Sequence, residues 1–189
     1  MVVIENMPPS QPRPALVAPA NVGAGAGEGR AALQALRGST AAAAEGVGRE
    51  YEVVVPDRIP THCVEDTGST YEINPLLMLA VLKVESNGRT GIVAQNTDGS
   101  ADLGPSQFNS RSWAKLLIQK YKIPRAALIH DMCQAVRALG FALRTEINAA
   151  GGDLWKGIGN YHSRTPKHHV KYIRLVYGAY KQMTMKGKF

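Results

Sequence analysis

The sequence predicts a mainly α-helical domain that carries a small β-hairpin and follows a flexible N-terminal tail. The first observation is a change of composition near residue 60, where an Ala-, Gly- and Pro-rich stretch gives way to ordinary globular sequence. The second is a series of segments whose apolar residues recur three and four positions apart, as on one face of a helix. The third is the run Asn96-Thr97-Asp98-Gly99-Ser100, whose Asp-Gly pair is typical of a hairpin turn.

Residues 1–59 are expected to form a disordered or weakly ordered tail, which could act as an export signal. Bulky apolar residues are scarce here, so most of this part cannot bury enough surface to offset the entropy of ordering. Tyr51–Val55 is a short strand-like run that we expect to pack on the edge of the domain. The domain itself is expected to span residues 60–183, and residues 184–189 are expected to form a short basic tail.

Helices are expected wherever apolar spacing coincides with end signals. Asn74-Pro75 opens the most apolar helix, with Asn at the cap and Pro at the first helical position, and Asn87-Gly88 ends it. The other helices are expected over Ile59–Thr67, Ser110–Tyr121, His130–Ala149, Leu154–Tyr161 and from Thr165-Pro166 onward. Residues expected to face the core are identified in three of these helices. They are Trp113, Leu116 and Leu117 in Ser110–Tyr121; Met132, Val136, Leu139, Leu143 and Ile147 in His130–Ala149; and His169, Ile173, Val176, Tyr177 and Tyr180 in the helix that starts at Thr165-Pro166.

The positive charge of the chain is concentrated in the domain. The formal net charge is +7, to which residues 1–59 contribute −1 and residues 60–189 contribute +8. A basic domain suits an anionic polymer, such as nucleic acid, a membrane surface or a cell-wall glycan whose peptides carry carboxylates; the alternative is that the charge only keeps a small domain in solution. The basic residues are scattered and form no nucleic-acid-binding motif, so nucleic acid is not an expected partner.

Membrane and metal signals are weak. No apolar stretch reaches the roughly 18 residues that a membrane-spanning helix needs, so no span is expected, and the N-terminus does not match a secretory signal.

His162, His168 and His169 have no carboxylate or cysteine partner at ligand spacing. We therefore expect no metal and no cofactor.

Two carboxylates, Glu85 and Asp102, are the candidates for catalysis. Glu85 ends an apolar helix directly after Val84, where burial penalises the charged form and keeps a carboxylic acid protonated. Asp102 follows a polar turn, where a carboxylate stays ionised. Such a pair suits glycoside cleavage, in which an acid protonates the leaving oxygen. The alternatives are a solvated glutamate at a helix end, and an aspartate that only accepts backbone N–H bonds in the turn.

The segment that contains both carboxylates resembles the catalytic region of the lysozyme superfamily. NTDGSADLGPSQFNSRSW is similar to the active-site hairpin of c-type lysozymes. Glu85-Ser86 and Gly104-Pro105-Ser106-Gln107, followed by Asn109, are similar to the Glu-Ser and Gly-Leu-Met-Gln motifs of the soluble lytic transglycosylase (SLT) domain. Pro105 and Ser106 stand where the family has Leu and Met, which line the cleft.

A later motif extends this resemblance. Gly159-Asn160-Tyr161-His162-Ser163 is similar to the form found in transglycosylases encoded beside type III and type IV secretion systems and pili. The resemblance covers Cys63–Tyr180 and implies a lysozyme-like fold of the goose-type or SLT kind. It implies that the catalytic residues are Glu85, Asp102 and Tyr161, and that the substrate-binding residues are Ser86, Gly104, Gln107, Asn109 and Asn160. For Tyr161 the alternative is a core tyrosine with a satisfied hydroxyl.

The resemblance implies cleavage of the β-1,4 bond between N-acetylmuramic acid and N-acetylglucosamine in peptidoglycan. In lytic transglycosylases one Glu protonates the glycosidic oxygen and then deprotonates the muramic 6-hydroxyl, which gives a 1,6-anhydro product. Asp102 is then a structural turn residue. In a hydrolytic lysozyme, the first alternative, Asp102 is the second catalytic carboxylate. The other alternative is a module that binds glycan or assists assembly without turnover.

The two cysteines, Cys63 and Cys133, permit one disulfide, with two buried free thiols as the alternative. The bond would close a loop of about 70 residues, worth roughly 4 kcal/mol in the chain-entropy model. The placement of both cysteines is also similar to that in the secretion-associated transglycosylases. The resemblance implies peptidoglycan glycan strands as a partner, together with secretion-system or pilus components. It implies a periplasmic or secreted location, reached by a non-classical, type III-like route.

Overall fold

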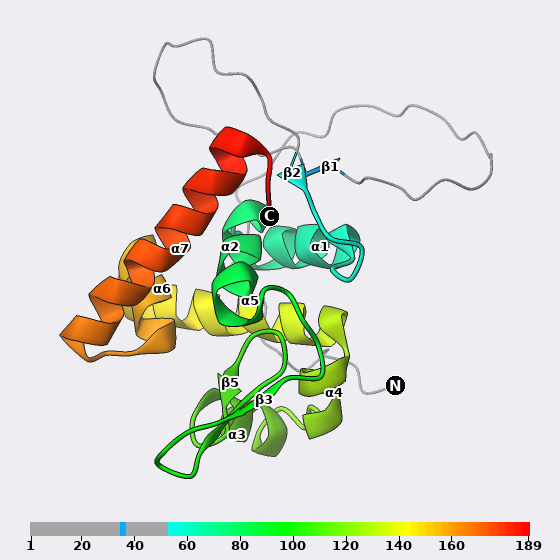
Figure 1. The fold of residues 1–189 in the computed structure, drawn as a ribbon. Coiled ribbons are helices and arrows are strands. Elements are labelled where there is room, and N and C mark those ends of the chain that lie inside the picture. Colours follow the sequence, from blue (N-terminus) through cyan, green and yellow to red (C-terminus); the bar gives the residue numbers. More distant parts are fainter. Residues whose placement is uncertain (1–34, 37–52) are drawn as a thin grey trace, which may run out of the picture.

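The computed structural model describes residues 35–36 and 53–189 of the chain, and most of the expected tail lies outside these residues (Figure 1). The described residues form a mainly helical fold with a small antiparallel sheet, as the sequence predicts. Its helices are α1 (Thr61–Tyr71), α2 (Pro75–Ser86), α3 (Trp113–Gln119), α4 (Arg125–His130), α5 (Met132–Ala149), α6 (Leu154–His162) and α7 (Pro166–Lys186). Its strands are β1 (Ala35–Leu36), β2 (Val53–Val54), β3 (Val93–Gln95), β4 (Ala101–Leu103) and β5 (Phe108–Asn109).

Helix α2 is the most deeply buried helix, and α7 runs beside it (Figure 1). Every residue from Leu76 to Leu82 is buried, because this stretch is apolar on all its faces. The Asn74 side chain accepts the N–H of Leu76 at 2.9 Å and starts the helix, and Asn87 ends it in the left-handed conformation with φ of 56°. Both predicted ends of this helix are confirmed.

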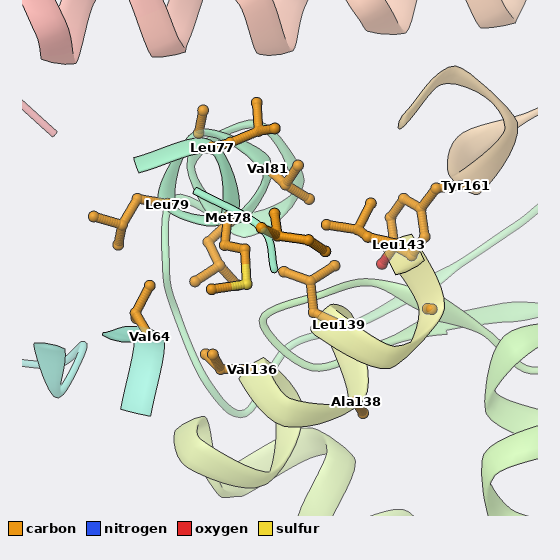
Figure 2. Close-up of a cluster of buried hydrophobic side chains, with 14 of the residues drawn as sticks. Val64, Leu77, Met78, Leu79, Val81, Val136, Ala138, Leu139, Leu143 and Tyr161 are labelled. Carbon is orange, nitrogen blue, oxygen red and sulfur yellow. The ribbon is translucent and has the colours of Figure 1, made fainter. Parts of the chain in front are cut away.

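Helix α5 supplies the other half of the core. The stripe predicted from its sequence is buried along its full length and comprises Met132, Val136, Leu139, Leu143 and Ile147. Figure 2 shows side chains of α2, including Met78 and Val81, facing Leu139 and Leu143 of α5, with Tyr161 of α6 at the end of this cluster. The core therefore reaches from the centre of the domain to Tyr161, which the sequence resemblance implies is a catalytic residue.

A disulfide joins α1 to α5. Cys63 and Cys133 are bonded, with their Cα atoms 5.2 Å apart, which excludes the alternative of two free thiols. Close to the other end of α1, Arg144 of α5 donates to the carbonyl oxygens of Tyr71 and Glu72 at 2.7 and 2.6 Å. These contacts satisfy carbonyl groups at a helix end and hold α1 in place on α5.

The sheet has the order β3–β4–β5, with both pairs antiparallel. Asp102 is central, since it pairs with Ala94 on one side and with Asn109 on the other. The hairpin predicted around Asp98-Gly99 is confirmed, but the third strand was not predicted. At two residues, β5 is too short to show the alternation by which strands are recognised.

The folded unit extends beyond the expected limits of 60 and 183. Val53, Val55 and Ile59 are buried in the core. At the other end α7 continues to Lys186, and the N–H of Val54 donates to the carbonyl of Gly187 at 3.0 Å. The side chain of Phe189 packs against the core, and the centroid of its ring lies 5.2 Å from Lys83 Nζ. Residues 184–189 are thus part of the domain.

Some predicted orientations are wrong. Leu116 and Tyr177 were expected to face the core but are 37% and 51% exposed. The buried positions of α7 are Tyr172, Val176 and Met183, so its inner face is rotated from the predicted one. Helix α3 begins at Trp113 rather than at residue 110, because the preceding residues bond back to the sheet and its turn. Within the described part of the chain, no helix has the length and apolarity to cross a bilayer.

Candidate active site

Glu85 lies in the last turn of α2, at the point where this buried helix reaches the surface of the domain. Leu76 to Leu82 of α2 are buried, Lys83 and Val84 are partly buried, and Asn87 directly after the helix is exposed. The left-handed Asn87 donates its backbone N–H to the carbonyls of Leu82 and Lys83, which fixes the end of the helix. The glutamate side chain is therefore carried by a rigid element and is only partly accessible.

Three effects determine the pKa of the Glu85 carboxyl group: burial, a hydrogen bond and a nearby charge. Burial raises the pKa of its carboxyl, the Tyr172 hydroxyl opposes this by donating to Oε1 at 2.5 Å, and the negative charge of Asp102 raises the pKa further. The resulting pKa is about 7. Glu85 can therefore both give and take a proton near neutral pH.

Asp102 is held by two amide groups. Asn96 Nδ2 donates to its Oδ2 at 2.9 Å, and Asn109 Nδ2 donates to its Oδ1 at 2.8 Å. Both amides also donate to Ser100 Oγ, at 3.1 and 2.9 Å. The backbone N–H of Ser100 in turn donates to Asp98 Oδ1 at 2.8 Å, which shapes the turn. The carboxylate of Asp102 is thus fixed in direction by a network within the sheet.

A cleft of about 260 Å³ brings the two carboxylates to one surface. Five of the residues predicted from the sequence line it, namely Glu85, Asp102, Gln107, Asn109 and Tyr161. Its other lining residues are Phe108, Ser112, Trp113 and His162, which the sequence did not assign to the site. The lining combines aromatic rings with amide, hydroxyl and carboxyl groups, which is suited to a carbohydrate.

Tyr161 forms part of the wall of this cleft. Its hydroxyl donates to the carbonyl oxygen of Ser106 at 2.5 Å, and its ring lies edge-on to Phe108 with centroids 6.3 Å apart. Burial, together with the charges of Glu85 and Asp102, raises the pKa of this hydroxyl well above its usual value. Tyr161 therefore has the satisfied hydroxyl of a core tyrosine, and the same bond anchors the segment that follows Gly104.

Three other predicted residues do not line the cleft: Ser86, Gly104 and Asn160. Ser86 is buried, and its Oγ donates to the carbonyl of Pro105 at 2.7 Å, which ties α2 to the sheet. Gly104 has φ of 68°, and a Cβ atom there would collide with the carbonyl oxygen of Leu128 in α4. The absence of a Cβ atom at Gly104 thus allows the turn to pack closely against α4.

The sequence did not reveal Tyr172, which bonds directly to Glu85 from α7. The ring of His162 stacks on Tyr172, with centroids 4.4 Å apart and planes 4° from parallel. A signal for Tyr172 was present, because Tyr172, Val176 and Met183 share one face of a helix. The stripe that contains Tyr177 and Tyr180 has a similar helical spacing, so the sequence alone does not distinguish the two faces.

Comparison with known proteins gives a distant relationship. No family model matches the chain. Over 117 residues, the chain is 28% identical to Invasion protein IagB of Salmonella typhimurium, and the match covers 60% of this chain and 71% of that protein. Invasion protein IagB of Salmonella typhi matches to the same extent. The chain is therefore a distant homologue of a bacterial invasion protein.

Proposed function

We propose that the protein is a peptidoglycan lytic transglycosylase that cleaves the β-1,4 bond between N-acetylmuramic acid and N-acetylglucosamine. The observation that carries this proposal is Glu85, a carboxyl group with a pKa of about 7 that faces a polar and aromatic cleft. A single group that is protonated in part of the molecules at neutral pH can act first as an acid and then as a base.

The reaction needs only one proton-transferring residue. Glu85 gives its proton to the glycosidic oxygen as the bond from this oxygen to the anomeric carbon of muramic acid breaks. The 6-hydroxyl of the same sugar then bonds to the anomeric carbon, and its proton passes to the Glu85 carboxylate. The products are a chain with a free 4-hydroxyl and a chain that ends in a 1,6-anhydro ring. No water is consumed, and Glu85 regains its starting form.

The other lining residues have supporting roles in this proposal. Asp102, fixed by Asn96 and Asn109, places negative charge where positive charge develops on the sugar. Trp113 and Phe108 offer aromatic surface to sugar rings, and Gln107 and Asn109 offer amide groups to their hydroxyl and acetamido substituents. Tyr161 covers one side of the cleft and limits the access of water.

A second candidate is a hydrolytic lysozyme. The observation that favours it is that Asp102 shares the cleft with Glu85 and has both carboxylate oxygens held in place. In this reaction water attacks the anomeric carbon with the help of Asp102, and the products retain the elements of water. The two candidates thus share the acid and differ in the attacking oxygen.

The distant homology to an invasion protein supports a role at the cell envelope. We propose that the enzyme opens the wall locally for an envelope-spanning secretion system or pilus. The disulfide between Cys63 and Cys133 supports action in the periplasm or after secretion, because disulfides persist mainly in oxidising compartments.

Digestion of purified peptidoglycan, followed by mass spectrometry of the products, tests this function. We expect 1,6-anhydro muropeptides, lighter by one water than hydrolysis products, and no products from Glu85→Gln. Since Gln keeps an oxygen that can accept from Tyr172, this variant should fold. We expect Asp102→Asn to lose less activity than Glu85→Gln. Hydrated products alone, with equal losses in both variants, would establish the hydrolase instead.

A further inference from the structure

A second hollow adjoins the candidate active site. Its volume is about 250 Å³, and it shares Glu85 and His162 with the cleft. The rest of its lining comes from Val84 at the end of α2 and from α7, which contributes His168, Lys171, Tyr172 and Leu175. A ligand at Glu85 could therefore extend from the cleft into this hollow.

The hollow contains one Lys or Arg side chain, that of Lys171, and this cation forms no ion pair with another described residue. The ion pairs in the part of the chain that the structure describes are Arg111–Asp98 and Arg164–Glu146, so Lys171 and His168 have no carboxylate partner there. Glu85 is the one carboxylate among the residues that line the hollow. Burial lowers the pKa of His162, which lines both the cleft and the hollow, and the nearby His168 and Lys171 lower it further, whereas the charge of Asp102 raises it.

The hollow also has a small apolar part. Leu175 of α7 is 50% exposed. Val84 is partly buried beside it. The hollow thus combines a small apolar surface with a cationic group, which fits a ligand that carries a short aliphatic group and a carboxylate.

We infer that this hollow binds the peptide stem of the glycan, with Lys171 and His168 facing a stem carboxylate and with Val84 and Leu175 contacting its methyl groups. This inference rests on the proposed function. The muramic sugar whose bond Glu85 cleaves carries its peptide on a lactyl group, and that peptide begins with alanine and contains free carboxylates. A hollow that shares Glu85 with the cleft lies within reach of this substituent.

The test measures binding, so it does not depend on turnover. Two ligands are compared, a muramic-acid-containing glycan fragment with its peptide stem and the same fragment without it. The proteins are full-length chains with Glu85→Gln, either alone or combined with Lys171→Glu or with Lys181→Glu. Lys181 is exposed on the same helix but does not line the hollow. Lys181→Glu is therefore the control, because it changes the net charge as much as Lys171→Glu does.

We expect the stem to strengthen binding by up to about fivefold, the equivalent of about 1 kcal/mol, which is the upper end of what an exposed ion pair contributes. Lys171→Glu should abolish this preference, while Lys181→Glu should retain it. Melting curves check that the variants fold. If the variant with Lys171→Glu does not fold, Lys171→Gln replaces it. Equal affinity for both ligands, or equal effects of the two reversals, would overturn the inference. Failure of the proposed function is distinct, because it shows as absent anhydro products from the enzyme with Glu85 intact.

Discussion

Glu85 depends on groups from different elements for its protonation state. Burial and the charge of Asp102 in β4 raise the pKa of Glu85, whereas the hydrogen bond from Tyr172 in α7 lowers it. A pKa near the working pH is the compromise that acid and base catalysis by one group requires. Tyr172 touches no other candidate catalytic carboxylate, so we regard it as a positioning residue for Glu85.

Substitution of Tyr172 by Phe tests this role. The Tyr172 bond favours the ionised form of Glu85, so its loss should raise the pKa of Glu85 above about 7. In a profile of kcat/KM against pH, the descending limb reports loss of the Glu85 proton. We expect this limb to move upward by up to about one unit, since a hydrogen bond to a charged group is worth roughly 1.5 kcal/mol and one unit corresponds to about 1.4 kcal/mol.

The matched control for this prediction is Tyr180→Phe, which changes a partly buried tyrosine of the same helix that lines neither hollow. Its pH profile should coincide with that of the unchanged protein. If Tyr172→Phe leaves the descending limb in place while lowering stability, Tyr172 is only a packing residue.

The sequence predicted both candidate carboxylates but not Tyr172, the residue whose hydrogen bond lowers the pKa of Glu85. Glu85 and Asp102 stand next to local signals in the sequence, a helix end and a Gly-containing turn. Tyr172 is 87 positions away from Glu85 in the sequence, and only the packing of α7 on α2 brings them together. Pairings of this kind depend on how one helix is rotated against another, which a single stripe of apolar residues does not determine uniquely.

At the scale of elements, the site depends on bonds that join α2, the sheet and α6. Ser86 at the end of α2 donates to Pro105, and Tyr161 of α6 donates to Ser106, so both helices hold the turn that follows β4. Gly104 allows α4 to approach the same turn. Helix α2 was predictable because it has a cap, a proline at its start and a left-handed Asn at its end, whereas α4 and β5 are too short to show a period.

The disulfide between α1 and α5 should contribute to stability rather than to catalysis. Neither cysteine lines the cleft, and the bond spans 70 positions of sequence. Its loss is expected to cost roughly 4 kcal/mol in the chain-entropy model and to lower the melting temperature by about 10 °C or more. The measurement is a melting curve of the oxidised protein with and without reductant.

The double variant Cys63→Ser, Cys133→Ser is the control for this experiment. It should melt like the reduced protein, show no response to reductant, and retain at low temperature the glycan cleavage that we propose for the unchanged protein. A reductant effect that is equally large in the double variant would show that the disulfide is not its cause.

For the whole molecule, the important property is the uneven distribution of charge. From Arg164 to Phe189 the chain has seven Lys or Arg residues and no Asp or Glu, and all seven are exposed. This stretch includes α7, which lies beside α2 and contributes Lys171 to the hollow next to Glu85 (Figure 1). The sequence predicted a basic domain, but only the structure shows that the basic helix borders the candidate active site.

If this charge attracts an anionic wall, binding should weaken with salt. Raising the ionic strength from about 0.01 M to about 1 M shortens the Debye length from roughly 30 Å to roughly 3 Å, which screens exposed charges almost completely. We therefore expect the fraction of protein that sediments with purified sacculi to fall steeply over this range. Reversal of Arg174 and Lys181 in α7 should weaken binding at low salt more than reversal of Lys115 and Arg125, which lie in α3 and α4. Because both pairs change the net charge equally, equal losses would mean that total charge, and not the position of α7 beside the hollow at Glu85, governs attraction to the wall.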